Sequence, residues 1–390
     1  MKIEKELLNE IRKRYPQVLN EKQLTGLINH VLGKLYPNVK KPIKFEAKTL
    51  RFLAFKKNSR YKTFQIPKKN GDTRDISAPI ASLKLLQKAI SVIFTAIFNP
   101  HHCATGFVYQ KSIVHNAKIH VDKAFVYNID LKEFFPSTDF RRVKTVLGLN
   151  PFNLSGDKEP LAFLIANLCC ENGVLPQGAP TSPILTNIVC QRLDRKLFKL
   201  SKENGCRYSR YADDITFSSN KDIFIDDFID KIEKIVKDEK YNINETKVRL
   251  QSWKNRQEVT GLIVNRKVNV NQSYMGYTRL LLYVWDSFGF EFAQKRLNSD
   301  IDKTKVYLID STRKSLTNVL KGRIDFISMV RGKDDVIVKR MLEKYQSLVM
   351  KTPESVSIDL NSNVETKSIL EILNIWESEG VENAMLKYKL

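Results

Sequence analysis

The stretch SRYADDITFSS, residues 209–219, places two aspartates side by side between two short segments. Side chains alternate in CRYSR before the pair and in ITFSS after it, which predicts two strands joined by a hairpin. Asp213 and Asp214 would then lie at the hairpin tip. Adjacent carboxylates repel each other unless a proton or a cation lies between them, so the pair indicates either a solvated turn or a metal site.

A third carboxylate favours the metal site. Asp130 ends the β-rich part of the segment KAFVYNIDLKEFFPS, which lies earlier in the chain. Three carboxylates on two neighbouring strands would supply the hard oxygen ligands that two Mg²⁺ ions about 3.5–4 Å apart require. Such a pair of ions can activate a primer hydroxyl and stabilise the departing pyrophosphate. The pattern therefore predicts nucleotide chemistry.

Bulk composition agrees with a nucleic-acid partner. The 390 residues carry a net charge of +22, and the commonest partner of a large basic surface is a polyanion, although some proteins are merely basic. The longest apolar runs are too short for a membrane-spanning helix, and the N-terminus is amphipathic, so we expect a cytoplasmic protein without a membrane partner. The five cysteines form no C-x-x-C pair and are expected to be reduced core residues.

Helical and strand patterns follow one another along the chain. Residues 1–36 contain two amphipathic helical patterns, YKTFQIPKKNGDTRDISAP predicts a hairpin around Asn70-Gly71, and a helix follows over 82–98. The segment PTSPILTNIVCQRLDRKLF predicts one helix that begins at Thr181 or Ser182 and has Pro183 in its first turn. After residue 287 the chain is helical and basic.

Four motifs, in order, resemble those of the reverse transcriptases. IPKKNGDTRDISAP resembles the fingers, NIDLKEFFPS the first palm carboxylate, PQG (176–178) the turn that touches nucleotide or template, and YADD the catalytic hairpin. The resemblance implies an α+β, right-hand polymerase fold with fingers, palm and helical thumb. It also implies RNA-directed DNA polymerisation.

The resemblance gives individual residues their expected roles. The catalytic residues are Asp130, Asp213, Asp214 and Lys247, the lysine protonating pyrophosphate. The metal positions for two Mg²⁺ ions, which Mn²⁺ could replace, are Asp130, Leu131, Asp213 and Asp214. The nucleotide-binding residues are Lys68, Lys69, Arg74, Phe135, Gln177 and Gly178. Phe135 matches the aromatic gate that excludes a ribose 2′-OH. A core aromatic at Phe135 and a plain surface lysine at Lys247 are the alternatives.

Two further strings resemble the signatures of retron reverse transcriptases. They are NAKIH, residues 116–120, and VTG, residues 259–261. The resemblance implies that the RNA-binding residues include Asn116, His120, Val259, Thr260 and Gly261. A structural histidine and a β-turn glycine are the alternatives, and both strings could simply support the RNA-binding surface.

The expected domains follow the family. They are an N-terminal helical cap (1–40), fingers with interleaved palm elements (41–125), a palm with the YADD hairpin (126–285), a basic helical thumb (286–350) and a short acidic extension (351–390). The extension holds 4 Lys and 7 Asp or Glu, a net charge of −3. It is expected to be a short helix that packs on the thumb or docks a protein partner.

The retron resemblance implies a specific reaction. The enzyme would use dNTPs to copy its cognate structured noncoding RNA from a 2′-OH primer, giving branched single-stranded DNA. It would act in antiphage defence with a separate effector protein. Two other hypotheses remain open. One is a reverse transcriptase of another kind, such as a group II intron-like, diversity-generating or defence-associated enzyme. The other is a noncatalytic RNA-binding scaffold.

Overall fold

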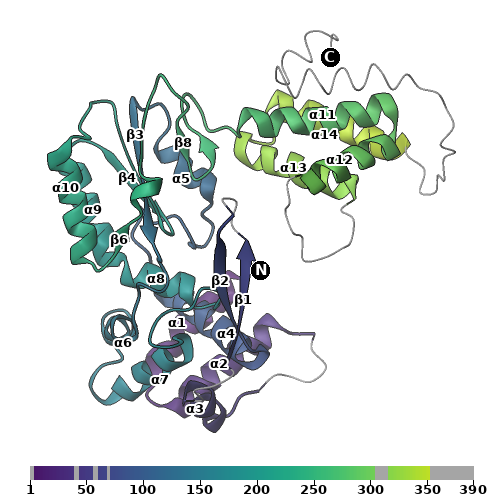
Figure 1. Cartoon of the computed structure of the whole chain (residues 1–390). Coiled ribbons are helices and arrows are strands. Elements are labelled where there is room, and N and C mark those ends of the chain that lie inside the picture. Colours follow the sequence, from purple (N-terminus) through teal and green to yellow (C-terminus); the bar gives the residue numbers. More distant parts are fainter. Residues whose placement is uncertain (1–3, 39–43, 56–59, 68–70, 304–314, 352–390) are drawn as a thin grey trace. The chain divides into compact units, whose positions relative to one another are not determined.

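The computed structural model describes residues 4–38, 44–55, 60–67, 71–303 and 315–351, in two compact units, Met1–Thr260 and Gly261–Leu390 (Figure 1). Helices and strands are mixed along the first unit and the second is mainly helical, which confirms the predicted α+β class. The expected nucleotide-binding residues Lys68 and Lys69 lie outside the described residues. The acidic extension does too, apart from Lys351.

Helices begin the first unit. The predicted helices are α1 (Lys5–Arg14), α2 (Glu21–Leu35) and α4 (Ala81–Ile97), whereas η1 (Tyr15–Gln17) and α3 (Ala47–Phe55) were not predicted. Leu7, Leu8 and Ile11 form the buried stripe of α1. Both α1 and α2 pack against α4, the helix expected over 82–98. The apolar faces read from the sequence therefore meet one another in a common core.

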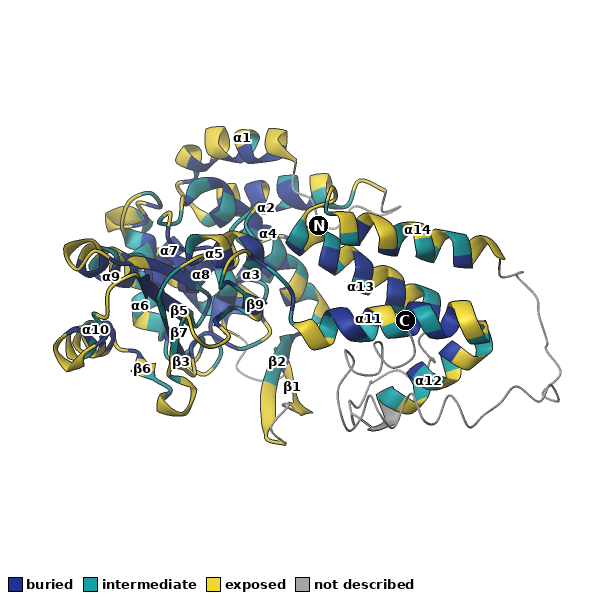
Figure 2. Ribbon diagram, turned by 90° about the horizontal axis from the view of Figure 1, so that it is seen from above, coloured by how far each residue is buried: buried dark blue, intermediate teal, exposed yellow. Residues whose placement is uncertain are grey.

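A two-stranded antiparallel sheet follows α3. Its strands, β1 (Tyr61–Pro67) and β2 (Thr73–Pro79), pair from Tyr61 with Pro79 to Pro67 with Thr73. Every residue of β1 after Tyr61 is exposed, so this hairpin extends into solvent (Figure 2). The predicted pairing is confirmed, although Asn70 of the expected turn is not among the described residues.

A five-stranded antiparallel sheet forms the centre of the first unit. Its strands are β3 (Phe125–Lys132), β4 (Arg207–Tyr211), β5 (Asp214–Ser219), β6 (Asn242–Ile243) and β7 (Arg249–Ser252). The order is β4-β5-β3-β6, and β7 also pairs with β3. Helices α9 (Gln191–Glu203) and α10 (Asp226–Asp238) bury one face, whereas α5 (Ile113–Ile119) contacts β4 from the other (Figure 1).

The helix predicted over PTSPILTNIVCQRLDRKLF is two helices, α8 (Ser182–Val189) and α9, with Cys190 between them. The apolar residues of α8 belong to the core around the N-terminal helices, whereas Leu193 and Leu197 of α9 belong to the core under the sheet. A single straight helix could not turn its stripe toward both cores. The prediction of one helix was wrong for this reason, although Thr181 and Pro183 begin α8 as expected.

The first unit is completed by α6 (Phe140–Gly148), η2 (Gly156–Lys158), α7 (Glu159–Cys169), η3 (Glu245–Lys247) and β8 (Glu258–Val259). All five cysteines are buried and none forms a disulfide, in agreement with the prediction. A membrane-spanning helix, which needs both length and apolar sequence, is not found among the described residues.

The second unit begins with β9 (Leu262–Ile263) and continues as α11 (Gln272–Phe288), α12 (Phe290–Lys303), α13 (Leu316–Arg331) and α14 (Val336–Lys351). Helices α11, α13 and α14 contact one another. Leu316, Leu320, Ile324 and Ile327 form the buried stripe of α13, at the three- and four-residue spacing of an amphipathic helix. The second unit starts at Gly261, whereas the expected thumb starts at residue 286, so the assignment of thumb residues stays a prediction.

Candidate functional site

The β4–β5 hairpin presents the paired aspartates. Tyr211 pairs with Asp214, which leaves Ala212 and Asp213 as a two-residue turn. Ala212 has a φ of 57°, in the left-handed region that a residue with a Cβ adopts only under constraint from its surroundings. The alternating sequence sets the two strands, and the turn places Asp213 at the tip as predicted.

The third carboxylate lies on the adjacent strand. Strand β3 pairs antiparallel with β5, so Asp130 is directly opposite Asp214. The Leu131 N–H donates to the Asp213 carbonyl oxygen at 3.0 Å and fixes the hairpin tip against β3. The Leu131 side chain is buried, so only its backbone could contribute to a metal site. The structure thus brings the three predicted aspartates to one end of the sheet.

Burial and neighbouring negative charge make the carboxylates of Asp213 and Asp214 hard to ionise. Burial, followed by the charges of Asp213 and Asp130, raises the pKa of Asp214 to about 6. Burial and the charge of Asp130 also raise the pKa of Asp213, against the opposing effect of Lys247 and Arg74. Burial is the largest cause of both shifts, and the neighbouring negative charges add to it. A cation at this position would stabilise the ionised carboxylates.

Lys247 approaches the same carboxylates from η3. Its Nζ donates to Asp130 Oδ1 at 2.9 Å and to Oδ2 at 3.0 Å, and Asn244 Nδ2 donates to Oδ2 at 3.3 Å. The lysine side chain is half exposed, whereas the Asp130 side chain is largely buried. The structure therefore places Lys247 at the site, as expected. Its role as a proton donor stays a prediction.

The chemistry of this donor set fits a divalent cation. Carboxylate oxygens are the ligands that Mg²⁺ and Mn²⁺ prefer, and three of them occupy adjacent positions here. Among the residues that the structure describes, however, no three His, Cys, Asp or Glu side chains are gathered closely enough to hold an ion. The side chains would have to close around the ion, and Asp130 would exchange its contact with Lys247 for one with the metal.

The PQG turn packs against the exposed hairpin. The Ser77 N–H of β2 donates to the Gln177 carbonyl oxygen at 2.9 Å. Gly178 has a φ of +130°, and a Cβ at this position would lie 2.8 Å from the Ser77 carbonyl oxygen. Glycine is needed here for both reasons. Arg74, on the same strand, is close enough to Asp213 to lower its pKa, so the strand that packs against the PQG turn also brings an expected nucleotide-binding residue near the carboxylates.

Phe135 is half-buried beside two other rings. Its ring centroid lies 5.5 Å from that of Phe134 and 6.1 Å from that of Phe107. Phe107 is 45% exposed and has a φ of 58°. The half-buried ring is compatible with both interpretations of Phe135, the aromatic gate and the core aromatic. Sequence reasoning did not identify Phe107, which carries no local motif.

The first retron-like string lies inside the protein. Asn116 and His120 are fully buried, and the His120 ring bridges Ser209 and Ser218 with two hydrogen bonds of 2.7 Å. Ser209 Oγ donates to Asn116 Oδ1 at 2.7 Å. Burial lowers the pKa of His120 to about 3, so the ring is neutral at physiological pH. These two side chains tie α5 to the hairpin strands on the same face of the sheet as Asp214, and their burial is incompatible with direct contact to RNA.

The second string forms a turn. Val259 is buried, so its side chain does not reach a ligand either, whereas Thr260 and Gly261 both have positive φ values, of 47° and 80°. Gly261 is exposed and has no atom within 4 Å of a Cβ position. The β-turn interpretation of the glycine therefore agrees with the geometry. RNA contact through Thr260 and Gly261 stays a prediction.

The sequence and structure also resemble known proteins. The model of the family described as reverse transcriptase (RNA-dependent DNA polymerase) matches residues 66–278. The retron Mx162 reverse transcriptase of Myxococcus xanthus is 34% identical, over 55% of this chain and 50% of that protein. The retron Ec86 reverse transcriptase of Escherichia coli is 30% identical, over 64% of this chain and 77% of that protein. The chain spans about half the length of the Myxococcus relative.

A structural comparison matches a telomerase from Candida albicans, solved in complex with a fragment of telomeric RNA. The TM-score is 0.42 and the sequence identity 10%, over 86% of this chain and 69% of that one.

Proposed function

Because the chain belongs to the reverse transcriptase family, and within it to the retron reverse transcriptases, we propose that it is an RNA-directed DNA polymerase that copies a structured noncoding RNA. The observation that carries the proposal is the pairing of Asp130 with Asp214 beside the Asp213 turn. A noncatalytic scaffold would have no use for three carboxylates held together against their own repulsion.

The side chains suggest how the reaction proceeds. Asp130, Asp213 and Asp214 would hold divalent cations, which when bound activate a primer hydroxyl and stabilise the departing pyrophosphate. Lys247 is half exposed, which would allow it to leave Asp130 and donate a proton to pyrophosphate. Arg74 carries a positive charge near Asp213 that would attract the triphosphate.

The nucleotide would be oriented from two further sides. The Gln177-Gly178 turn, which packs closely against β2 because Gly178 has no Cβ, would present its backbone to a base or sugar. The Phe135 ring, supported by Phe107, would occupy the place of a ribose 2′-OH and so favour deoxynucleotides. The template would be bound mainly through phosphates and helix shape, as the net charge of +22 favours.

The finer parts of the proposal rest on the family alone. They are priming from a 2′-OH, a branched RNA–DNA product, two Mg²⁺ ions, a cytoplasmic location and antiphage defence with a separate effector. The relatives are named retron reverse transcriptases, and the proposal extends that biology to this chain.

One experiment tests the proposal directly. The protein is expressed with its native flanking DNA, and the nucleic acid that copurifies is run on a denaturing gel after RNase, DNase or debranching treatment. We expect a discrete single-stranded DNA whose mobility changes on debranching. It should be absent when Asp213→Asn and Asp214→Asn are combined, and present when the exposed Asp222 is changed to Asn as the matched control.

Other outcomes would redirect the assignment. DNA that survives the double substitution would remove these aspartates from catalysis. An unbranched product would favour a reverse transcriptase of another kind. RNA without DNA in both proteins, together with no incorporation on any primed template, would favour the scaffold.

A further inference from the structure

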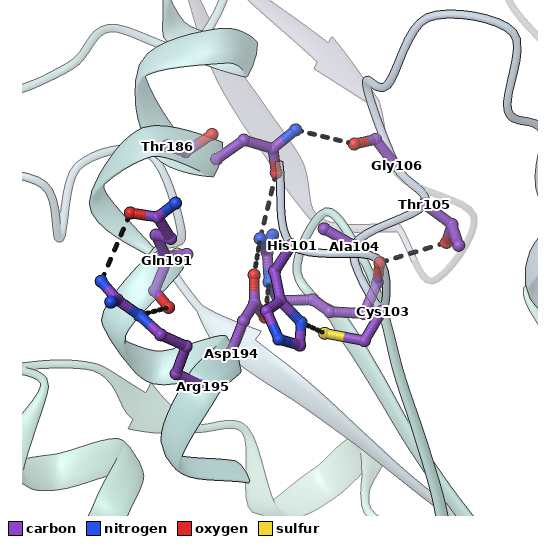
Figure 3. A network of polar contacts seen from close by, with 12 residues as sticks. His101, Cys103, Ala104, Thr105, Gly106, Thr186, Gln191, Asp194 and Arg195 are labelled. Atoms are coloured by element: carbon purple, nitrogen blue, oxygen red, sulfur yellow. Dashed lines mark hydrogen bonds and ion pairs between the residues drawn. The ribbon is translucent and has the colours of Figure 1, made fainter. Parts of the chain in front are cut away.

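The face of the central sheet opposite the carboxylates carries a buried ion pair. Asp130 and Asp214 lie across from each other on one side of the strands, whereas Arg210 of β4 reaches α9 on the other. Its guanidinium donates to both carboxylate oxygens of Asp194, Nε to Oδ1 at 2.8 Å and Nη2 to Oδ2 at 2.7 Å. Neither side chain is more than 1% exposed. Figure 3 shows Asp194 within this network of polar contacts.

The same guanidinium also holds the hairpin turn. Arg210 Nη1 donates to the Ala212 carbonyl oxygen at 3.1 Å, and Nη2 donates to Asn187 Oδ1 at 3.1 Å. The peptide that carries the Ala212 carbonyl links Ala212 to Asp213. The planar Arg210 guanidinium is held by Asp194 of α9, and it therefore fixes the position of the peptide that directly precedes the catalytic Asp213.

The loop that contains Thr105 and Gly106 also contacts the turn. The Asn187 amide donates to the Gly106 carbonyl oxygen at 2.9 Å, and Thr105 N–H donates to the Arg210 carbonyl oxygen at 2.8 Å. A Cβ on Gly106 would lie 2.3 Å from the Ala212 nitrogen, so the loop backbone touches the turn backbone. Only glycine permits this approach.

These contacts explain how Ala212 keeps a φ of 57°. A strained residue persists when its surroundings over-determine its conformation, and such strain clusters at functional sites. Here the Ala212 carbonyl oxygen accepts a hydrogen bond from Arg210, and the Ala212 nitrogen packs against Gly106. Both contacts come from residues other than the expected metal- and nucleotide-binding residues.

We propose that Arg210, Asp194, Asn187 and Gly106 form a hairpin clamp that positions the catalytic turn. The clamp residues are positioning residues, because they act on Asp213 through the Ala212 peptide. This inference rests on the proposed polymerase function. It predicts that loosening the clamp slows the chemical step and leaves nucleotide binding largely unchanged, because the Gln177-Gly178 turn and Arg74 belong to other elements.

Gly106→Ala is the first test. The added methyl group must displace the Ala212 nitrogen or the loop. We expect a kcat about 100-fold lower on poly(rA)·oligo(dT), the scale of loss for a displacement of about 1 Å, with the KM for dTTP within about threefold of wild type. Gly26→Ala is the matched control, since Gly26 lies in α2 with nothing within 4 Å of its Cβ position.

Arg210→Lys is the second test, because it keeps a positive charge beside Asp194 and so protects the fold. Lysine lacks the planar fork and cannot hold Asp194, Asn187 and Ala212 together. We expect a smaller loss of kcat, about tenfold, with the same unchanged KM. All rates are measured at least ten degrees below each protein's Tm, so that a lower folded fraction does not contribute.

Hydrogen exchange of the peptide spanning residues 207–219 provides a readout that needs no substrate. Both variants should exchange this peptide about tenfold or more faster than wild type, whereas a peptide from α7 should be unchanged. Unchanged exchange at 207–219 would overturn the clamp, whether or not the enzyme is active. A kcat within threefold of wild type in both variants would overturn it as well. If wild type extends no primer while the exchange result holds, the proposed function fails and the clamp stands as a structural device.

Discussion

Asparagine in place of Asp214 should stabilise the metal-free protein while it abolishes DNA synthesis. Burial and the neighbouring carboxylates raise the pKa of Asp214 from 3.8 to about 6. Ionised Asp214 therefore lowers the free energy of unfolding, because the carboxylate is less stable in the folded protein than in the unfolded chain. Asparagine has nearly the same shape and no charge. The substitution therefore removes the repulsion and keeps the packing.

The pKa change sets the size of the effect. A shift from 3.8 to about 6, at ~1.4 kcal/mol per unit, corresponds to about 3 kcal/mol less free energy of unfolding for the ionised protein. Asp214→Asn should recover most of this at pH 8, which is a rise of roughly 5–10 °C in the Tm of the first unit. The penalty is absent when the carboxyl is protonated in both states. The gain should therefore shrink as the pH falls through 6 and vanish near pH 4.

The assay is thermal unfolding in EDTA at several pH values between 4 and 8, for wild type, Asp214→Asn and the exposed-site control Asp222→Asn. Mg²⁺ added at pH 8 should stabilise wild type more than Asp214→Asn, because the ion binds the folded carboxylates. A lower Tm for Asp214→Asn in EDTA at pH 8 would refute the reasoning. So would a gain of equal size at pH 4 and pH 8.

Three further substitutions test other parts of the site. Gly178→Ala should lower kcat/KM for dNTPs by roughly 10- to 100-fold in primer extension, because the methyl group meets backbone at a positive φ; normal kinetics would show that the turn can move. Phe135→Ala should reduce the preference for dTTP over UTP by at least about tenfold, and an unchanged preference would leave this ring a core aromatic. His120→Gln should lower the free energy of unfolding by about 1–3 kcal/mol in urea, because the bonds to Ser209 and Ser218 are lost, without changing the RNA affinity of the folded protein. Since the folded pKa of His120 is about 3, below the ordinary 6.5, wild type should lose stability as the pH falls below 6.5, and His120→Gln should lose less.

Much of the fold follows from local pattern. The alternation on either side of YADD predicts β4 and β5, Pro183 marks the beginning of α8, and the stripes of α1 and α13 match their buried faces. These features depend on residues a few positions apart, which is the range over which periodicity and capping act. The four motifs are also local, and their order along the chain indicated the reverse transcriptase family.

The break at Cys190 does not follow from local pattern. One continuous apolar stripe runs from Ile184 to Leu197, yet its two halves meet different cores. The retron-like residues give a second example. Asn116 and His120 are polar, and polar residues are usually exposed, but four side-chain hydrogen bonds within the core replace most of their hydration.

The sequence by itself determined strands β1 to β5, the YADD hairpin and the three aspartates, because alternation and turn chemistry are local. Only the tertiary structure decided that Asp130 stands opposite Asp214, that Arg210 binds Asp194 behind them and that Gly106 touches the Ala212 turn. These pairs are far apart in the chain, and no local signal records which strand, helix or loop will lie beside which. Strand register and the packing of α9 on the sheet bring them together, and the charges then interact because they are buried side by side.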